Sequence, residues 1–215
     1  MGYNAGTAIT TGTENTVVGA LAGDAITTGN ENTAVGKTAL SADTKGHRSV
    51  AIGQGTLATQ NFTSSTNSYN TAVGFQSGNA VTTGSNNTLI GGLAGDAITT
   101  GVNNVAVGKS ALGANTTANN NTAVGNACLD ANTTGASNSA LGASSLGANT
   151  TGASNTAVGN DALGANTTGN INTAVGLSAL ATNTEGLNNS ALGVNALNAN
   201  TTGDDNVAIG YQALL

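Results

Sequence analysis

The chain has 215 residues, of which 7% are charged, 2% are aromatic and none is proline. Four basic and ten acidic residues give a formal net charge of −6, which argues against nucleic acid as a partner. The sequence has no run of about 18 apolar residues, so it predicts no membrane span in this chain. A single cysteine excludes a disulfide framework.

A glycine that closes the motif Asn-Thr-Ala-Val-Gly recurs along the whole chain. Ten of its eleven spacings are 17 residues, and the exception, Gly53 to Gly74, is 21. A second glycine lies seven residues before each, replaced once by Asn67 and once by Ala118. Such a period indicates stacked coils that are each too small to bury a core of their own. The closing glycines are Gly19, Gly36, Gly53, Gly74, Gly91, Gly108, Gly125, Gly142, Gly159, Gly176, Gly193 and Gly210.

Seventeen residues with Gly and Asn at the corners can hold two short strands and two turns, but not two helices. We therefore expect an all-β parallel solenoid, in which residues 1–215 form one repeat domain. With strands ~4.8 Å apart, some twelve and a half coils give a rod roughly 60 Å long. Gly2 already occupies a glycine position of the repeat and Leu215 falls within a coil, so we expect a fragment of a longer protein, with any export signal or anchor outside it.

The arm before the closing glycine is β-branched and alternates, which predicts a strand. We expect its last residue, always Val, Ile or Leu, to point into the coil together with the Thr, Ser or Val two positions earlier. The residue between them then faces outward. It is Val17, Leu89 or, in the other coils, Ala. This interpretation predicts an exposed apolar alanine strip along the rod and self-association through it.

The arm after the closing glycine carries a small residue followed by a leucine. In four coils glycine replaces the leucine, and a β-branched residue follows three positions later. The leucine coils have a polar residue at that later position, such as Asp43, Gln60 or Asn115. This compensation predicts that both positions face one interior. The four glycine and β-branched pairs are Gly6 and Ile9, Gly23 and Ile26, Gly78 and Val81, and Gly95 and Ile98.

Residues 12–40 closely match residues 84–112, and the irregular part of the chain lies between these two segments. A turn there is enlarged by four residues around Gln60 to Thr66, and long turns often carry function on a rigid scaffold. The alternative is a drifted coil whose extra residues are merely tolerated. We expect deletion of residues 61–64 to restore the period and to leave the thermal melt nearly unchanged. The candidate partner-binding residues are Lys45, His47, Arg48, Phe62, Tyr69 and Phe75.

No residue set predicts catalysis, a cofactor or a metal site, because the one histidine has no repeated partners. Cys128 stands where Ala is usual, which predicts a buried filler. The Asn column four residues before the closing glycine predicts a stacked amide ladder, and Asn in sequons such as Asn115-Thr116-Thr117 is attributed to turns. Four acids lack the dense Asp/Gly loops of calcium-binding rolls and are interpreted as solvated turn residues. They are Asp24, Asp96, Asp130 and Asp161.

The segments RSVAIG at Arg48–Gly53, NVAVG at Asn104–Gly108 and NVAIG at Asn206–Gly210 resemble the head repeat of trimeric autotransporter adhesins of the YadA-like type. The resemblance covers the whole chain. It implies a left-handed parallel β-roll, a side-by-side homotrimer on a bacterial outer membrane, and a host glycan or matrix protein as partner. The family's commonest repeat is shorter than the 17 residues found here, and none of its binding residues transfers by position. Similar repeats occur in phage tail fibres.

Three functional hypotheses follow for an extracellular, cell-surface or virion protein that is not an enzyme. The first is the adhesive rod of a trimeric adhesin, and the second is a segment of a phage tail fibre. The third is an ice-binding solenoid, since Thr pairs such as Thr27-Thr28 and Thr133-Thr134 recur in register. Adjacent residues of a strand point to opposite faces, so we expect one Thr of each pair to face outward.

Overall fold

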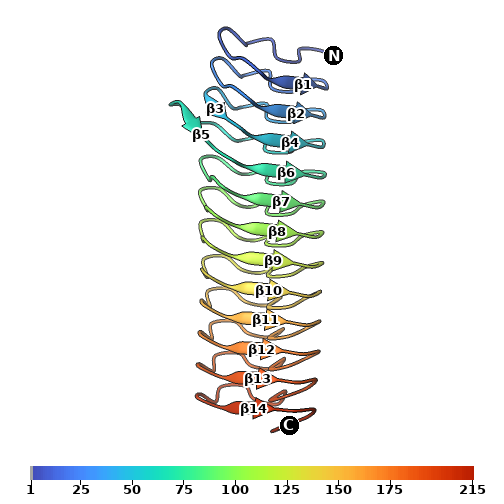
Figure 1. Ribbon diagram of the computed structural model, residues 1–215, viewed down its shortest axis with the longest axis vertical. Helices are drawn as coiled ribbons and strands as arrows, with labels where there is room; N and C mark the ends of the chain where they lie inside the picture. Colours follow the sequence, from blue (N-terminus) through green and yellow to red (C-terminus); the bar gives the residue numbers. More distant parts are fainter. Residues whose placement is uncertain (1) are drawn as a thin grey trace.

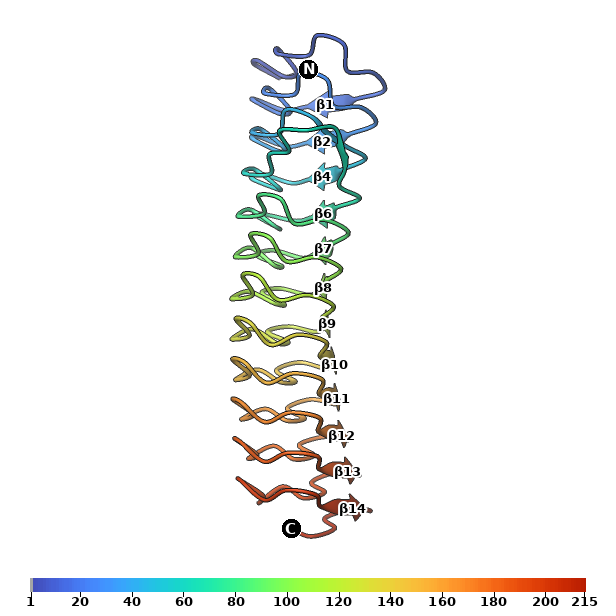
Figure 2. The same ribbon diagram turned by 90° about the vertical axis from the view of Figure 1, so that its left-hand side faces the viewer.

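The computed structural model describes residues 2–215 as one parallel β-solenoid, with the two ends of the chain at opposite ends of a rod (Figure 1). Twelve strands of three residues stack along one side of the rod, and turns form the other side (Figure 2). No helix occurs in residues 2–215. The strands of this sheet are β1 Thr16–Val18, β2 Thr33–Val35, β4 Val50–Ile52, β6 Thr71–Val73, β7 Thr88–Ile90, β8 Val105–Val107, β9 Thr122–Val124, β10 Ser139–Leu141, β11 Thr156–Val158, β12 Thr173–Val175, β13 Ser190–Leu192 and β14 Val207–Ile209.

The register of the sheet follows the repeat. Thr16 pairs with Thr33, seventeen residues later, and the same offset holds for most neighbours. Across the enlarged turn Val50 pairs with Thr71, so the sheet absorbs the four extra residues without losing register. The enlarged turn leaves the rod, and its strand β5 (Thr66–Asn67) pairs with β3 (Gly46–His47) of the preceding coil in a small second sheet. The expected all-β parallel solenoid with 17-residue spacing is confirmed.

The second arm of each coil is not a strand, so the expectation of two strands per coil is wrong. It is a succession of tight turns in which left-handed residues alternate with right-handed ones. Ser110 and Leu112 have φ of +56° and +53°, and the Gly113 N–H donates to the Ser110 carbonyl at 3.2 Å. Because of this alternation Ala111 and Leu112, although adjacent, both lie fully buried. A strand would have turned one of them outward.

The core contains the alanine column, which reverses the expected orientation of the strand. Ala34, Ala123 and Ala157 are fully buried, whereas Val18 and Leu141 are 47% and 52% exposed. Where the opposite arm supplies a leucine, that side chain fills the interior, and the inward position of the strand holds only a methyl group. The Val, Ile and Leu column therefore faces outward, and the prediction of an exposed alanine strip through which copies associate is wrong.

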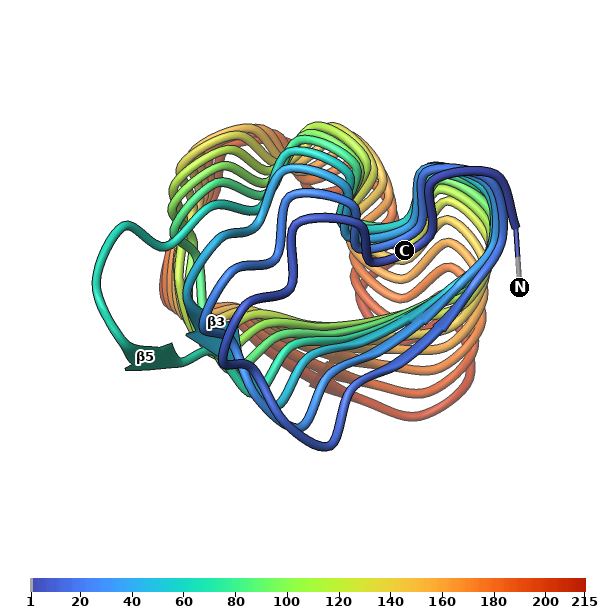
Figure 3. The ribbon, with the colours of Figure 1, turned by 90° about the horizontal axis from the view of Figure 1, so that it is seen from above.

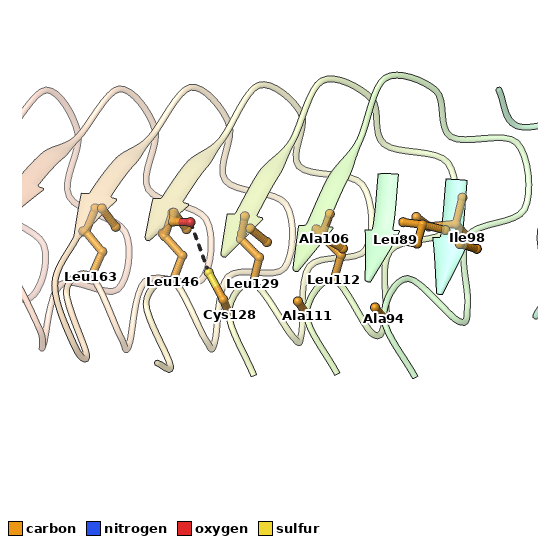
Figure 4. Close-up of a cluster of buried hydrophobic side chains, with 14 of the residues drawn as sticks. Leu89, Ala94, Ile98, Ala106, Ala111, Leu112, Cys128, Leu129, Leu146 and Leu163 are labelled. Atoms are coloured by element: carbon orange, nitrogen blue, oxygen red, sulfur yellow. Dashed lines mark hydrogen bonds between the residues drawn. The ribbon is translucent and has the colours of Figure 1, made fainter. Parts of the chain in front are cut away.

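The exchange between the leucine and β-branched positions is confirmed. Ile26, Val81 and Ile98 are buried in the coils that carry glycine instead of leucine. Figure 4 shows Ile98 beside Leu89. A Cβ on Gly95 would lie 2.8 Å from the Ile98 Cδ1 atom, so the β-branched side chain occupies the space that leucine takes elsewhere. Both positions line one continuous interior.

The amide ladder is also confirmed, and the structure adds a second one. In the first ladder Asn15 Oδ1 accepts the Asn32 N–H at 3.0 Å, while the Asn32 amide donates to the Gly46 carbonyl at 2.9 Å. In the second ladder each side-chain amide donates to the Asn carbonyl oxygen of the preceding coil. These buried residues satisfy turn backbone groups that would otherwise be unpaired. The second ladder is Asn115, Asn132, Asn149, Asn166, Asn183 and Asn200.

Candidate functional site

The outer face of the twelve-stranded sheet is a regular surface along the rod. The first and third residues of its strands point outward, because the middle residue faces the interior; it is buried in every strand of this sheet except β1, where Val17 is partly buried. The first column contains only Thr, Ser and Val, and the third only Val, Ile and Leu, so this outer sheet face carries no charge. The third column consists of Val18, Val35, Ile52, Val73, Ile90, Val107, Val124, Leu141, Val158, Val175, Leu192 and Ile209.

Two further columns border this face. The leading column is the residue two positions before each strand, and its members all have φ near +60°. The trailing column is the residue two positions after each strand. Leading residues are Glu14, Glu31, Arg48, Tyr69, Asn86, Asn103, Asn120, Ser137, Ser154, Ile171, Asn188 and Asp205; trailing residues are Ala20, Lys37, Gln54, Phe75, Gly92, Lys109, Asn126, Ala143, Asn160, Leu177, Val194 and Tyr211.

The enlarged turn protrudes beyond the outline of the other coils (Figure 3). Its base is a buried polar cluster around the Asp43 carboxylate. The Gly46 and Phe62 N–H groups donate to Asp43 Oδ1 at 3.0 and 3.1 Å, and the Gln60 amide donates to Oδ2 at 2.6 Å. The Asn70 amide donates in turn to the Gln60 carbonyl oxygen at 2.8 Å. Asp43 and Gln60 thus replace the second ladder at this point of the rod.

Phe62 anchors the turn instead of offering a surface. Its side chain is only 6% exposed, and its carbonyl accepts the Lys45 N–H at 3.2 Å and the Thr44 hydroxyl at 3.0 Å. Deletion of residues 61–64 would remove this side chain and leave the buried Asp43 carboxylate with fewer donors. The structure therefore leads us to expect a stability cost from a deletion that restores the sequence period.

Arg48 and Tyr69 lie together at the leading edge of the outer sheet face. The Arg48 Nε donates to the Glu31 carboxylate at 2.7 Å, and its NH1 donates to the Tyr69 hydroxyl at 3.0 Å. The guanidinium also lies 5.8 Å from the Tyr69 ring centroid. The hydrogen bond from Arg48 lowers the pKa of Glu31, and the same bond raises the pKa of Arg48. Both charges are exposed, so the ion pair contributes little to stability.

His47 ties the enlarged turn to the neighbouring coil. Its Nδ1 accepts the Asn30 N–H at 2.9 Å, and its Nε2 lies 2.8 Å from the Ser65 hydroxyl. The same backbone group in another coil, the Val102 N–H, donates to an asparagine side chain instead, at 2.8 Å. His47 therefore takes the position that Asn119 holds in that coil, and it reaches one further partner in the turn.

The six candidate partner-binding residues do not form one patch. Phe62 is buried, and Phe75 lies in the trailing column, across the strand β6 from Tyr69. Arg48 is engaged by Glu31 and Tyr69, and the Lys45 side chain is exposed beside the turn. The sequence does not show that the residues flanking each strand form two exposed edges, because alternation along a strand does not fix which of its faces points inward.

Three other residues that the sequence singles out are Cys128, Asn115 and Asp96. Cys128 is fully buried in the alanine position, with its Sγ 3.1 Å from the Ser145 hydroxyl, and burial raises its pKa. Asn115 is also fully buried, which agrees with a turn role for the sequon. Burial, with a smaller effect from the charge of Asp130, raises the pKa of Asp96.

Among residues 2–215 no three acidic, His or Cys side chains gather as metal ligands, and no pocket opens. The same residues contain no helix long and apolar enough to cross a membrane. Comparisons with protein-family models, with curated proteins and with solved structures find no match for this chain.

Proposed function

We propose that this chain is a structural and adhesive rod that associates in parallel with two further copies through the outer sheet face, outside the cell, on a bacterial surface or on a phage particle. The observation that carries the proposal is the uncharged aliphatic column that runs the length of the sheet. A monomer leaves these side chains in water, and contiguous apolar surfaces of this kind mark interaction sites. The sequence resemblance to trimeric adhesin heads supports the number of copies.

The face runs the whole length of the sheet. Twelve strands spaced ~4.8 Å apart span about 53 Å, so copies that lie side by side would be in contact along the rod. The protruding turn lies at the border of this face, where an assembled rod would still present it to a host glycan or matrix protein.

Sedimentation of the purified chain tests the proposal. We expect a trimer, and we expect Val124→Asp with Val158→Asp to yield folded monomers, because each charge would be buried at the interface. Thr134→Asp with Thr168→Asp is the matched control, since these residues are exposed at a corner of the same coils. A wild-type chain that remains monomeric at high concentration contradicts the proposal.

Ice binding is the second candidate for the same face. Its support is the outward Thr column, two residues from the aliphatic column and in register along the sheet. The Thr pairs at the corners support it less, because the first hydroxyl of each pair, such as that of Thr133, already donates to a backbone carbonyl at 3.0 Å. A monomeric chain with thermal hysteresis would favour this candidate over the trimer.

A further inference from the structure

In three of the twelve coils, the two edges of the outer sheet face carry residues of matching chemistry. The leading residue and the trailing residue of a coil are six positions apart, on opposite sides of one strand. Glu31 stands across from Lys37, Tyr69 from Phe75 and Ile171 from Leu177. No coil places two like charges at its two edges. The other charged edge residues each stand across from an uncharged residue; they are Glu14, Arg48, Lys109 and Asp205.

A closed ring of parallel rods brings the two edges of the same coil together. In cyclic symmetry about an axis parallel to the rods, neighbouring copies are related by rotation alone, so each coil meets the same coil of its neighbour. The trailing edge of one copy then meets the leading edge of the next. A contact with a rise of one coil cannot close and would generate a filament.

A shifted register does not improve the match. If each trailing residue met the leading residue of the following coil, Lys37 would face Arg48, and Leu177 would face Asn188. A shift in the other direction would place Lys37 against Glu14 and Val194 against Ile171, but Leu177 against Ser154. Charge therefore disfavours the first shift, and closed symmetry excludes both.

We infer that copies of this chain pair edge to edge in register, with Glu31–Lys37, Tyr69–Phe75 and Ile171–Leu177 as the contacts between chains. The inference rests on the proposed side-by-side association and specifies its geometry. The Glu31 carboxylate, already bonded to Arg48, has lone pairs left to accept from the Lys37 ammonium of a neighbour. Ile171 and Leu177, both exposed in one chain, would bury each other.

Cross-linking tests the pairing on the full chain. In a Cys128→Ala background, Ile171→Cys with Leu177→Cys is treated with a short bis-maleimide and separated on a denaturing gel. We expect covalent trimers, since each chain would be joined to the next at two edges. A link within one chain does not change the number of chains in the product. Ile171→Cys with Val194→Cys, which tests the register shifted by one coil, is the matched control and should give a several-fold lower yield.

The outcomes separate the pairing from the association itself. Each single-cysteine variant should stay uncross-linked alone, and a re-annealed mixture of the two should give covalent dimers. The chain could sediment as a trimer but give no covalent trimer through cysteines 171 and 177, or give more through cysteines 171 and 194. Either result would overturn the register and leave the proposed function intact. Monomers in sedimentation overturn both.

Discussion

The coils around Gly78 and Gly95 and the coils from Leu112 to Leu197 enclose the same interior with different side chains. In the first group Leu89 extends from the strand between two glycines, and a Cβ on either glycine would lie 2.7 Å from one of its methyl groups. In the second group the strand supplies alanine, and leucine comes from the opposite arm. The glycine, the large strand residue and the β-branched residue therefore replace leucine, alanine and asparagine, respectively.

The two groups also differ in buried polarity. Val81 and Ile98 fill the position at which the leucine coils place an asparagine of the second ladder. The leucine coils thus bury an amide in each turn and satisfy it along the rod, whereas the glycine coils bury only aliphatic atoms there. The comparison teaches that two different sets of side chains can fill the same interior of a coil.

The largest expected effect on stability comes from removing the side chain of Leu89, which fills space in two coils. We expect Leu89→Ala to cost about 4–5 kcal/mol, because the glycines beside it have no side chains to fill the cavity. The matched change in a leucine coil, Leu146→Ala, should cost about 2–3 kcal/mol. Equilibrium unfolding in guanidinium chloride measures both. Equal costs would contradict the view that one leucine serves two coils.

Breaking the second ladder should have the next largest effect. The Asn149 amide donates to Asn132 Oδ1 at 2.8 Å and to the Gly152 carbonyl at 2.9 Å. We expect Asn149→Ala to cost about 2–3 kcal/mol, because it leaves these buried acceptors unpaired. The exposed Asn160→Ala should stay within about 0.5 kcal/mol of wild type. Equilibrium unfolding in denaturant measures the stability of both variants. An Asn149→Ala variant as stable as wild type would show that the ladder is dispensable.

Converting one leucine coil to the glycine type sharpens the comparison further. Leu112 and Asn115 follow the coil of Ile98, so Leu112→Gly with Asn115→Ile extends the glycine block by one coil. We expect each single variant to be destabilised and the double variant to recover at least about 1 kcal/mol relative to the sum. A double-mutant cycle measures this coupling. Strict additivity would mean that the two positions do not share a volume.

The smallest effect concerns the cysteine in the leucine coils. Cys128 occupies an alanine position, so Cys128→Ala should change stability by less than about 1 kcal/mol. Burial raises the pKa of the thiol and disfavours the reactive thiolate. We therefore expect no reaction with a chromogenic disulfide reagent at pH 8 until denaturant is added. Rapid labelling of the native protein would show that the coils open locally.

Much of this architecture is predictable from residue spacing. The period, the first ladder and the exchange between Leu112-type and Ile98-type positions all follow from the sequence. The sequence does not show which face of the strand points into the core, because alternation defines two faces without saying which one is inside. Hydrophobicity alone favours Val124 over Ala123 for the core, and only the width of the coil reverses that choice. The turns of the second arm were also missed, because leucine rarely adopts the left-handed conformation of Leu112.

The direction of the hydrogen bonds has a mechanical consequence. Backbone bonds such as that from the Leu112 N–H to the Cys128 carbonyl, and both amide ladders, join successive coils and so run along the rod. A load that pulls the two ends apart acts on one junction at a time, as in unzipping. Each released coil would add roughly 17 × 3.4 Å, or about 58 Å, of extended chain. The rod is thus built to yield in equal steps under tension, with a regular sawtooth in a single-molecule stretching trace.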